Sequence, residues 1–371
     1  MSDARERIAH ASRLVVKIGS SSLTNAEGGL HGEHLDELVG ALVRNVRAGV
    51  QLVLVSSGSI AAGTPALGLR KPPRDLATQQ AAASVGQGIL LAHYTAQFAE
   101  HDIRVGQILL TAEDLIRRTH YRNAQRTLGR LLELGVLPIV NENDTVATDE
   151  IRFGDNDRLA ALVAHVVQAD GLVLLTDIDG LYDRPPSQAG ATHIQTVTSA
   201  DDLAGVSLGG RGSGIGRGGM ATKVEASLMA SEAGIPVVLT SADQVSQALL
   251  GEVTGTVFEP SGKRRSPRQM WLAHATSARA AVQIDAGAVR ALRQRQASLL
   301  AAGVVGVSGA FVAGEPVDIV GPDGAIVARG LVGYDAAEFG RLVGRTTAQL
   351  IAEFGPDYER EIVHRDDLVL L

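Results

Sequence analysis

The run LVVKIG, residues 14–19, indicates the fold of this chain. It is apolar except for Lys17 and ends at a glycine, as expected for a strand buried on both faces of a parallel sheet. Helical patterns lie between this run and similar ones, at residues 35–49, 155–169 and 219–234. The similar runs are QLVLVSSG (51–58), IRVGQILLT (103–111), VLPIVNEN (136–143), GLVLLTD (171–177) and IPVVLT (235–240). This alternation predicts an α/β fold, a three-layer sandwich with a mainly parallel central sheet and ligand sites at the carboxyl ends of its strands.

The composition agrees with this fold class. Of the 371 residues, 45% are apolar, only 3% are aromatic and 42 are glycines, a mixture typical of α/β proteins. The net charge of −7 argues against a surface for nucleic acid or anionic membranes. The absence of Cys excludes disulfides, zinc–thiolate sites and a thiol nucleophile. Because neither a signal-peptide pattern nor a convincing membrane span is present, we expect a cytoplasmic protein that does not enter the membrane.

The strand–helix alternation stops near residue 258, so we expect the α/β domain to span residues 1–258. Residues 259–276 are polar, basic and contain proline, which indicates a linker. A helical pattern at 285–300 and short, glycine-punctuated strands then predict a small β-rich domain over residues 277–371. This last segment has nine Arg, no Lys and twelve acidic residues, so RNA binding is disfavoured.

Polar residues gather where the expected strands end. Lys17 lies in the first run, and a buried ammonium there needs either a structural ion pair or a bound phosphate. The second run ends in Ser56-Ser57-Gly58-Ser59, at the start of a helical pattern where backbone N–H groups favour a carboxylate or a phosphate. Because the pattern G-x-S-x-G is absent there, we expect a hydrogen-bonding serine rather than a nucleophile.

The densest polar cluster is NENDTVATDEIRFGDND, residues 141–157, directly after a buried run. Asp155 alone has a simpler explanation as the N-cap of the following helix. The cluster as a whole suits a substrate ammonium group or a metal–phosphate assembly. Glycoside hydrolysis also uses paired carboxylates, but the parallel β-α-β pattern does not support that chemistry here.

Two further segments complete the candidate site. Thr176 and Asp177 end another run, where the charge of Asp177 is placed to orient lysines or a metal. A glycine-rich stretch, residues 209–219, precedes a helix that has Lys223 in its first turn. Helix N–H groups and two lysines, Lys223 and Lys17, would suit the transfer of a phosphoryl group from a nucleotide. A flexible surface loop is the alternative, and it explains the glycines but not the lysine.

The segments VVKIGSSSL, VSSGSIAAG, NENDTVATDEIRFGDND, LLTDIDGLY and GGMATK occur in one order, and in this combination the chain resembles the amino-acid-kinase superfamily. Within it, the chain is most similar to the kinases that act on the side-chain carboxylate of glutamate. The C-terminal segments DAGAVRAL, SLLAAGV, VSGAF and GAIVARGLVGY resemble the PUA domain that many members carry. The resemblance covers nearly the whole chain and implies the amino-acid-kinase fold with a PUA-like domain.

The resemblance implies transfer of the γ-phosphoryl group of ATP, with Mg²⁺, to L-glutamate. The product would be γ-glutamyl phosphate, the first committed intermediate towards proline. Proline as feedback inhibitor, a homo-oligomer, and hand-over of the product to glutamyl-phosphate reductase are further expectations, and residues 116–128 are a hypothesis for control or subunit contacts. The alternatives are another amino-acid kinase, acting on N-acetylglutamate, aspartate or a nucleoside monophosphate, and an RNA-binding PUA protein.

Positions that match the family give the expected roles. Lys17 and Lys223 would neutralise the migrating phosphoryl group, Asp177 would position these lysines, and Asp157 would support the transfer. The expected substrate-binding residues are Ser57, Asn141, Asp144, Asp155 and Asn156. The expected nucleotide-binding residues are Lys17, Thr176, Asp177, Arg217, Gly218, Gly219, Met220, Ala221, Thr222 and Lys223. Arg217 departs from the family, which often has Thr there, and it either adds a phosphate contact or narrows the nucleotide pocket.

Overall fold

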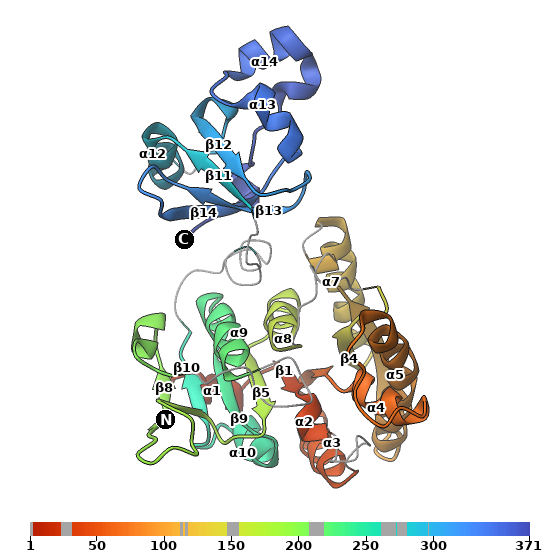
Figure 1. Cartoon of the computed structure of the whole chain (residues 1–371). Coiled ribbons are helices and arrows are strands. Elements are labelled where there is room, and N and C mark those ends of the chain that lie inside the picture. The colour runs from red at the N-terminus through yellow and green to blue at the C-terminus, as the bar shows by residue number, and fades with distance from the viewer. Residues whose placement is uncertain are drawn as a thin grey trace. The chain divides into compact units, whose positions relative to one another are not determined.

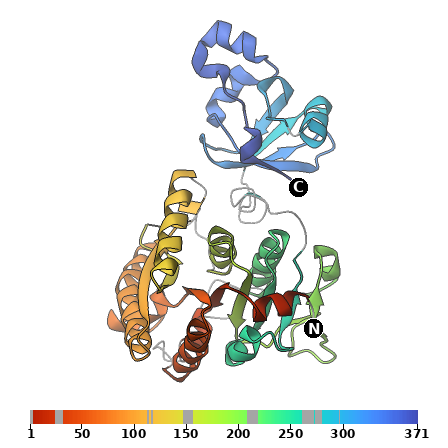
Figure 2. The same ribbon diagram turned by 180° about the vertical axis from the view of Figure 1, so that it is seen from behind.

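The chain forms two compact units, residues 1–267 and 268–371 (Figures 1 and 2). The borders expected from the sequence, with a linker at 259–276, stay a prediction. The computed structural model describes residues 3–23, 32–111, 114–115, 118–146, 156–207, 219–260, 272, 280–295 and 297–371.

The first unit is built on an eight-stranded sheet with the order β3-β4-β2-β1-β5-β9-β10-β8. Every neighbouring pair is parallel except β9 and β10. The strands are β1 (Arg13–Ile18), β2 (Gln51–Ser56), β3 (Arg104–Leu110), β4 (Val136–Glu142), β5 (Gly171–Thr176), β8 (Thr196–Val197), β9 (Val237–Ser241) and β10 (Thr256–Phe258). A separate hairpin pairs β6 (Leu181–Tyr182) with β7 (His193–Ile194). The six apolar runs predicted as strands are confirmed, and β1 lies between β2 and β5.

Helices cover both faces of this sheet, which confirms the three-layer α/β sandwich (Figure 1). They are α1 (Asp3–Ala9), α2 (Ser20–Leu23), α3 (Gly32–Arg47), α4 (Ser59–Ala66), α5 (Leu76–Ala99), α7 (Arg118–Glu133), α8 (Asn156–Val166), α9 (Met220–Glu232) and α10 (Val245–Leu249). The short 3-10 helices are η1 (Ala200–Leu203) and η2 (Ala242–Gln244). Gly49 and Gly234 follow α3 and α9 with φ of 91° and 81°, so both act as the C-terminal stops that the sequence predicts.

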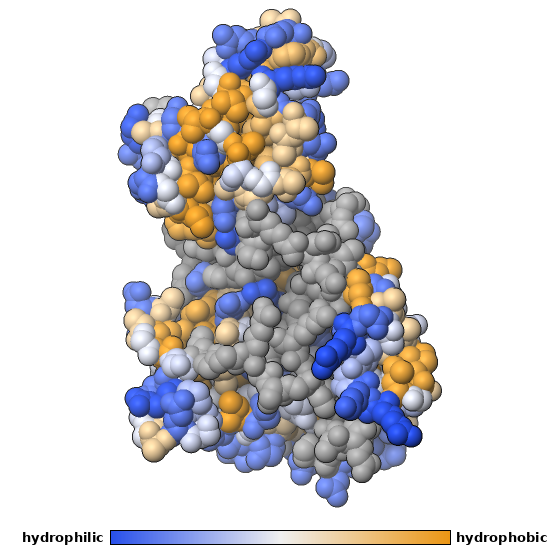
Figure 3. All heavy atoms as spheres, viewed as in Figure 1, coloured by the Kyte–Doolittle hydropathy of each residue, from blue (hydrophilic) through white to orange (hydrophobic). Residues whose placement is uncertain are grey.

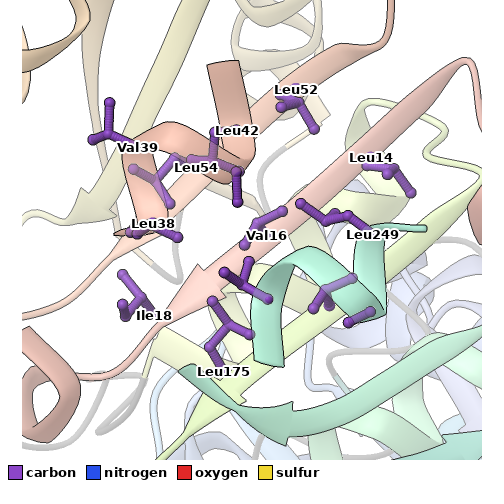
Figure 4. Packing of buried hydrophobic residues seen from close by; sticks show 14 of the residues in the cluster. Leu14, Val16, Ile18, Leu38, Val39, Leu42, Leu52, Leu54, Leu175 and Leu249 are labelled. Carbon is purple, nitrogen blue, oxygen red and sulfur yellow. The ribbon is translucent and has the colours of Figure 1, made fainter. Parts of the chain in front are cut away.

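The faces of β1 decide where the side chain of Lys17 points. Leu14, Val16 and Ile18 share a hydrophobic core with α3, α5 and α10 (Figure 4). Successive side chains of a strand point to opposite faces of the sheet, so Lys17 faces the other layer. That layer contains α8, which packs on β1, and α9, which packs on α8.

The second unit has a five-stranded sheet with the order β12-β11-β13-β14-β15. Its strands are β11 (Ala281–Ile284), β12 (Val304–Ser308), β13 (Pro316–Val320), β14 (Ile326–Leu331) and β15 (Leu368–Leu370). Its helices are α12 (Ala286–Arg295), α13 (Phe339–Leu342) and α14 (Thr347–Phe354), with 3-10 turns η3 (Ala301–Gly303), η4 (Ala336–Glu338), η5 (Pro356–Glu359) and η6 (Arg365–Asp367). The β-rich domain and the helix after residue 285 are confirmed, whereas α13 and α14 were not expected from the sequence.

Apolar residues lie on the face of the second unit that Figure 3 shows. The large apolar side chains exposed in this unit are Leu300, Val305, Val312, Ile326 and Leu371. Among the described residues of both units, no helix is long and apolar enough to cross a membrane.

Candidate active site

Lys17 and Asp157 form a fully buried ion pair between the sheet and the helix layer. The Nζ of Lys17 contacts Oδ1 of Asp157, and the two side chains are only 1% and 0% exposed. Asp157 lies in the first turn of α8, the helix that packs on the face of β1 to which Lys17 points. The structural ion pair, one of the two partners that the sequence allows for Lys17, is therefore present. It lies at the carboxyl end of the central strand β1.

Lys223 reaches the same carboxylate from α9. Its Nζ donates to Oδ2 of Asp157 at 3.1 Å. The neighbouring Thr222 hydroxyl donates to Gly219 O at 2.9 Å and also lies 3.4 Å from Oδ2 of Asp157. Because the first backbone N–H groups of a helix lack acceptors within it, this end of α9 combines amide donors with two convergent ammonium groups. Such an arrangement suits an anionic phosphate.

A chain of hydrogen bonds between side-chain amides, the amide relay, begins at Asn156, one residue before Asp157. The Nδ2 of Asn156 donates to Ser56 O, to Ser57 Oγ and to Asn141 Oδ1, at 3.0, 3.0 and 2.7 Å. Asn141 lies near the end of β4 and passes the relay on to α5, where its Nδ2 donates to Gln87 Oε1 at 2.6 Å. The relay joins the ends of β2 and β4 to the start of α8.

The turn after β2 brings the serines to this relay. Ser57 N donates to Ile18 O at 3.2 Å, which ties the end of β2 to the end of β1. Gly58 then has a φ of 106°, a left-handed conformation that suits glycine, and α4 begins at Ser59. The hydroxyl of Ser59 donates to Oδ2 of Asp144 at 3.1 Å, so Asp144 is held next to the same turn.

A buried tyrosine supports this turn from α5. Tyr94 OH lies 2.9 Å from Ser56 Oγ, and the tyrosine is fully buried. Burial raises the pKa of the Tyr94 phenol well above its usual value, since the charged form would lose its hydration. Tyr94 therefore stays neutral at physiological pH and anchors the end of β2.

Comparison with known proteins identifies the family. Residues 12–241 match the amino acid kinase family and residues 280–354 match the PUA domain. The glutamate 5-kinase of Streptomyces avermitilis is 58% identical over 373 residues, which cover all of both chains. The glutamate 5-kinase of Salinispora arenicola is 59% identical over 368 residues, covering 99% of this chain and all of that protein. The chain belongs to the glutamate 5-kinase branch of the amino acid kinase family.

The solved structures agree at the level of the fold. Carbamate kinase from Giardia lamblia bound to AMP-PNP matches with a TM-score of 0.51 at 17% identity, over 68% of this chain and all of that chain. The resemblance read from the sequence is thus confirmed for the kinase family and for the PUA domain. The chain is a kinase.

Asp157 contacts both lysines, and the positioning role expected of Asp177 stays a prediction. In the described part of the chain Asp177 contacts neither lysine; its Oδ1 accepts from Thr176 Oγ1 at 2.9 Å and the residue is exposed. The physical reason is the geometry of β5, whose end carries Asp177 out of the buried layer in which the lysines meet. Thr176 itself is buried at the end of β5.

Some of the expected residues lie outside the described residues: Asp155, Arg217 and Gly218. Gly219, Met220 and Ala221 are described and lie, partly exposed, at the start of α9. Their nucleotide-binding roles stay predictions.

Sequence reasoning missed two groups beside the site. Gln87 accepts a hydrogen bond from Asn141, although it lies inside a helix and not at the end of a strand. Arg158 and Glu225 pair across α8 and α9, next to the buried contacts of Asp157 and Lys223. The only sequence signal for Gln87 is Gly86, because a glycine inside a helical pattern often marks a close packing contact.

Proposed function

We propose that this chain transfers the γ-phosphoryl group of ATP to the side-chain carboxylate of L-glutamate, the first step of proline biosynthesis. The product is L-glutamyl 5-phosphate. One observation carries the proposal: two consecutive residues of α8 serve two different clusters. Asn156 bonds to the Ser57–Asn141 relay, and Asp157 bonds to Lys17 and Lys223.

The two clusters suit the two reactants. The relay consists of uncharged hydroxyl and amide groups, with the Asp144 carboxylate beside it, and this set can hold the carboxylate and ammonium groups of an amino acid. The lysine cluster and the start of α9 suit the phosphates of a nucleotide. Because Asn156 and Asp157 are adjacent, the acceptor carboxylate and the phosphates meet at the start of α8.

The chemistry needs positioning rather than a base. A carboxylate is already an anionic nucleophile, so no proton has to be removed before it attacks. The difficulty is to bring two anions together in line, and Lys17 and Lys223 reduce their repulsion. Asp157 keeps both ammonium groups at the same point, which makes it a positioning residue in this proposal.

The residues present fit a Mg²⁺ ion that arrives with the nucleotide. Among the described residues, no group of three or more His, Asp or Glu side chains could hold a metal by itself. Mg²⁺ commonly binds substrate phosphates together with one or two carboxylates, and the Asp157 carboxylate lies in the lysine cluster. When bound, the ion neutralises phosphate charge.

We also propose the regulatory features that belong to this activity. These are inhibition by proline, self-association, and hand-over of the unstable acyl phosphate to glutamyl-phosphate reductase. Self-association is supported by β3, which ends the sheet order on one side and so presents an edge that another chain can cover.

The activity can be tested by trapping the product. Hydroxylamine converts acyl phosphates to hydroxamates, so purified protein with ATP and Mg²⁺ should yield a hydroxamate from L-glutamate. N-acetyl-L-glutamate and L-aspartate are run in parallel, and added proline should lower the signal. Hydroxamate from another acid would move the substrate within the family. No hydroxamate from any acid, with folded protein that binds ATP, would sink the proposal.

A further inference from the structure

Gln87 of α5 lies beside the turn that follows β2. Gly86 precedes it, and a Cβ built on Gly86 would lie 1.8 Å from Ser59 O, so the backbone of α5 touches the start of α4 there. Gln87 is only 8% exposed. Its Oε1 accepts from Asn141 Nδ2, which places this amide at the end of the relay through Asn156.

The nitrogen of the same side-chain amide, Nε2, has no such hydrogen bond. Gln87 Nε2 is buried, and no hydrogen-bond partner is found for it among the described residues. A primary amide nitrogen carries two N–H donors. Buried donors are nearly always paired with an acceptor, so an isolated one in a polar site indicates that something else supplies the acceptor.

The orientation of the amide follows from two backbone groups. Amide oxygen and nitrogen look alike, and their assignment has to come from the hydrogen-bond network. The backbone N–H of Glu142 can only donate, and it points to Asn141 Oδ1 at 2.9 Å. The carbonyl of Ser56 can only accept, so the group of Asn156 that faces it must be Nδ2. With both asparagines fixed, Asn141 presents Nδ2 to Gln87, which must answer with Oε1.

We propose that Gln87 is a further substrate-binding residue, whose Nε2 donates to a carboxylate oxygen of the amino-acid substrate. The inference rests on the proposed function, because that function supplies an acid at the relay. A neutral amide suits this position: it offers two donors to an anion without adding a charge that would need its own partner.

Two substitutions separate this role from a purely structural one. Gln87→Glu keeps an oxygen for Asn141 Nδ2 but replaces the free N–H donors with a second anionic oxygen. Gln87→Met has similar length, is uncharged and removes the contact to Asn141 altogether. If Gln87 only supported Asn141, Gln87→Met would be the more damaging change. If Nε2 binds the substrate carboxylate, Gln87→Glu is the more damaging change, because like charges then face each other.

The measurement is steady-state kinetics by hydroxamate formation, with calorimetric titration of L-glutamate. For Gln87→Glu we expect the KM and Kd for L-glutamate to rise by about tenfold to a hundredfold, with the KM for ATP within about twofold of wild type. Gln97→Glu is the matched control, since Gln97 lies on the same helix about 15 Å further along, and it should leave both values unchanged.

The outcomes distinguish this inference from the proposed function. Wild-type protein that neither binds nor phosphorylates L-glutamate overturns the function and this inference with it; if it phosphorylates another acid, the same variants are compared with that acid. Wild-type activity together with an unchanged glutamate KM in Gln87→Glu overturns the role of Gln87 alone. A larger defect in Gln87→Met than in Gln87→Glu does the same. If Gln87→Glu does not fold, an unchanged glutamate Kd in Gln87→Met decides against the proposal.

Discussion

Arg158 and Glu225 form an ion pair that ties α8 to α9 next to the buried contact between Asp157 and Lys223. Arg158 directly follows Asp157 in α8, and Glu225 comes two residues after Lys223 in α9. The side chain of Glu225 is 47% exposed, whereas the Asp157 carboxylate is fully buried. The two helices that carry Asp157 and Lys223 are therefore joined by an inner contact and an outer one.

We expect the outer pair to affect nucleotide binding more than stability. Glu225→Gln should lower the free energy of unfolding by less than about 1 kcal/mol, because a half-exposed pair is well screened by water. It should raise the KM for ATP more than the KM for glutamate, since α9 holds the lysine on the phosphate side. Glu133→Gln breaks the exposed pair with Arg130 in α7 and is the control. Identical kinetics in the two variants would contradict this role of Arg158 and Glu225.

The inner contact should matter for both folding and activity. Asp157→Asn leaves the buried Lys17 ammonium facing an amide, and breaking a buried ion pair costs about 3–5 kcal/mol. We expect a clearly lower midpoint in urea unfolding, and a kcat at least about a hundredfold lower. Asp177→Asn should leave stability nearly unchanged, because Asp177 is exposed. Equal loss of stability in the two variants would show that Asp157 does not hold the two lysines in place.

The lysines themselves can be tested separately from the carboxylate. Lys223→Met should lower kcat by about a hundredfold or more, because it removes one of the two cations proposed to neutralise the transferring group. Lys71→Met is the matched control, since Lys71 is exposed, and it should behave as wild type. Hydroxamate formation with saturating glutamate and ATP reports kcat for both. Retention of most of the activity in Lys223→Met would remove Lys223 from the mechanism.

The strands and the positions of both lysines could be predicted because they depend on local patterns. A run such as residues 14–19 can only be buried on both faces, and Lys17 inside it had to find a partner. Lys223 could be placed because a glycine-rich stretch and an apolar period fix where α9 begins. Both inferences use residues that are close together in the sequence.

The partner of the lysines could not be predicted because it depends on long-range geometry. Asp157 and Asp177 are both aspartates near the end of a strand or helix, so the local sequence does not distinguish them. Only the packing of α8 on the Lys17 face of β1 selects Asp157, and Lys223 lies 66 positions further along the chain. Gln87 was missed for the same reason, since its contact with Asn141 spans 54 positions.

The close approach of α4 and α5 gives a prediction with an internal control. A Cβ on Gly86 would lie 1.8 Å from Ser59 O, a contact with rigid backbone, so Gly86→Ala must push α4 and α5 apart. We expect the free energy of unfolding to fall by about 1–3 kcal/mol and the KM for glutamate to rise, because Ser59 and Gln87 both move. Gly88→Ala lies on the same helix, and its Cβ would meet no described atom within 4 Å. That variant should be stabilised slightly, by up to about 1 kcal/mol.

Tyr94 should make stability depend on pH in the alkaline range. Burial raises the folded-state pKa of the phenol above its unfolded value of about 10, so this contribution is fully present below pH 10 and is lost as the pH rises towards the folded pKa. Tyr94→Phe also removes the bond to Ser56 Oγ, which should cost about 1 kcal/mol at neutral pH. The midpoint of urea unfolding should therefore be lower for the variant at pH 7, and the gap to wild type should shrink above pH 10. A gap that stays constant to pH 11 would mean that the Tyr94 phenol is not kept neutral by folding.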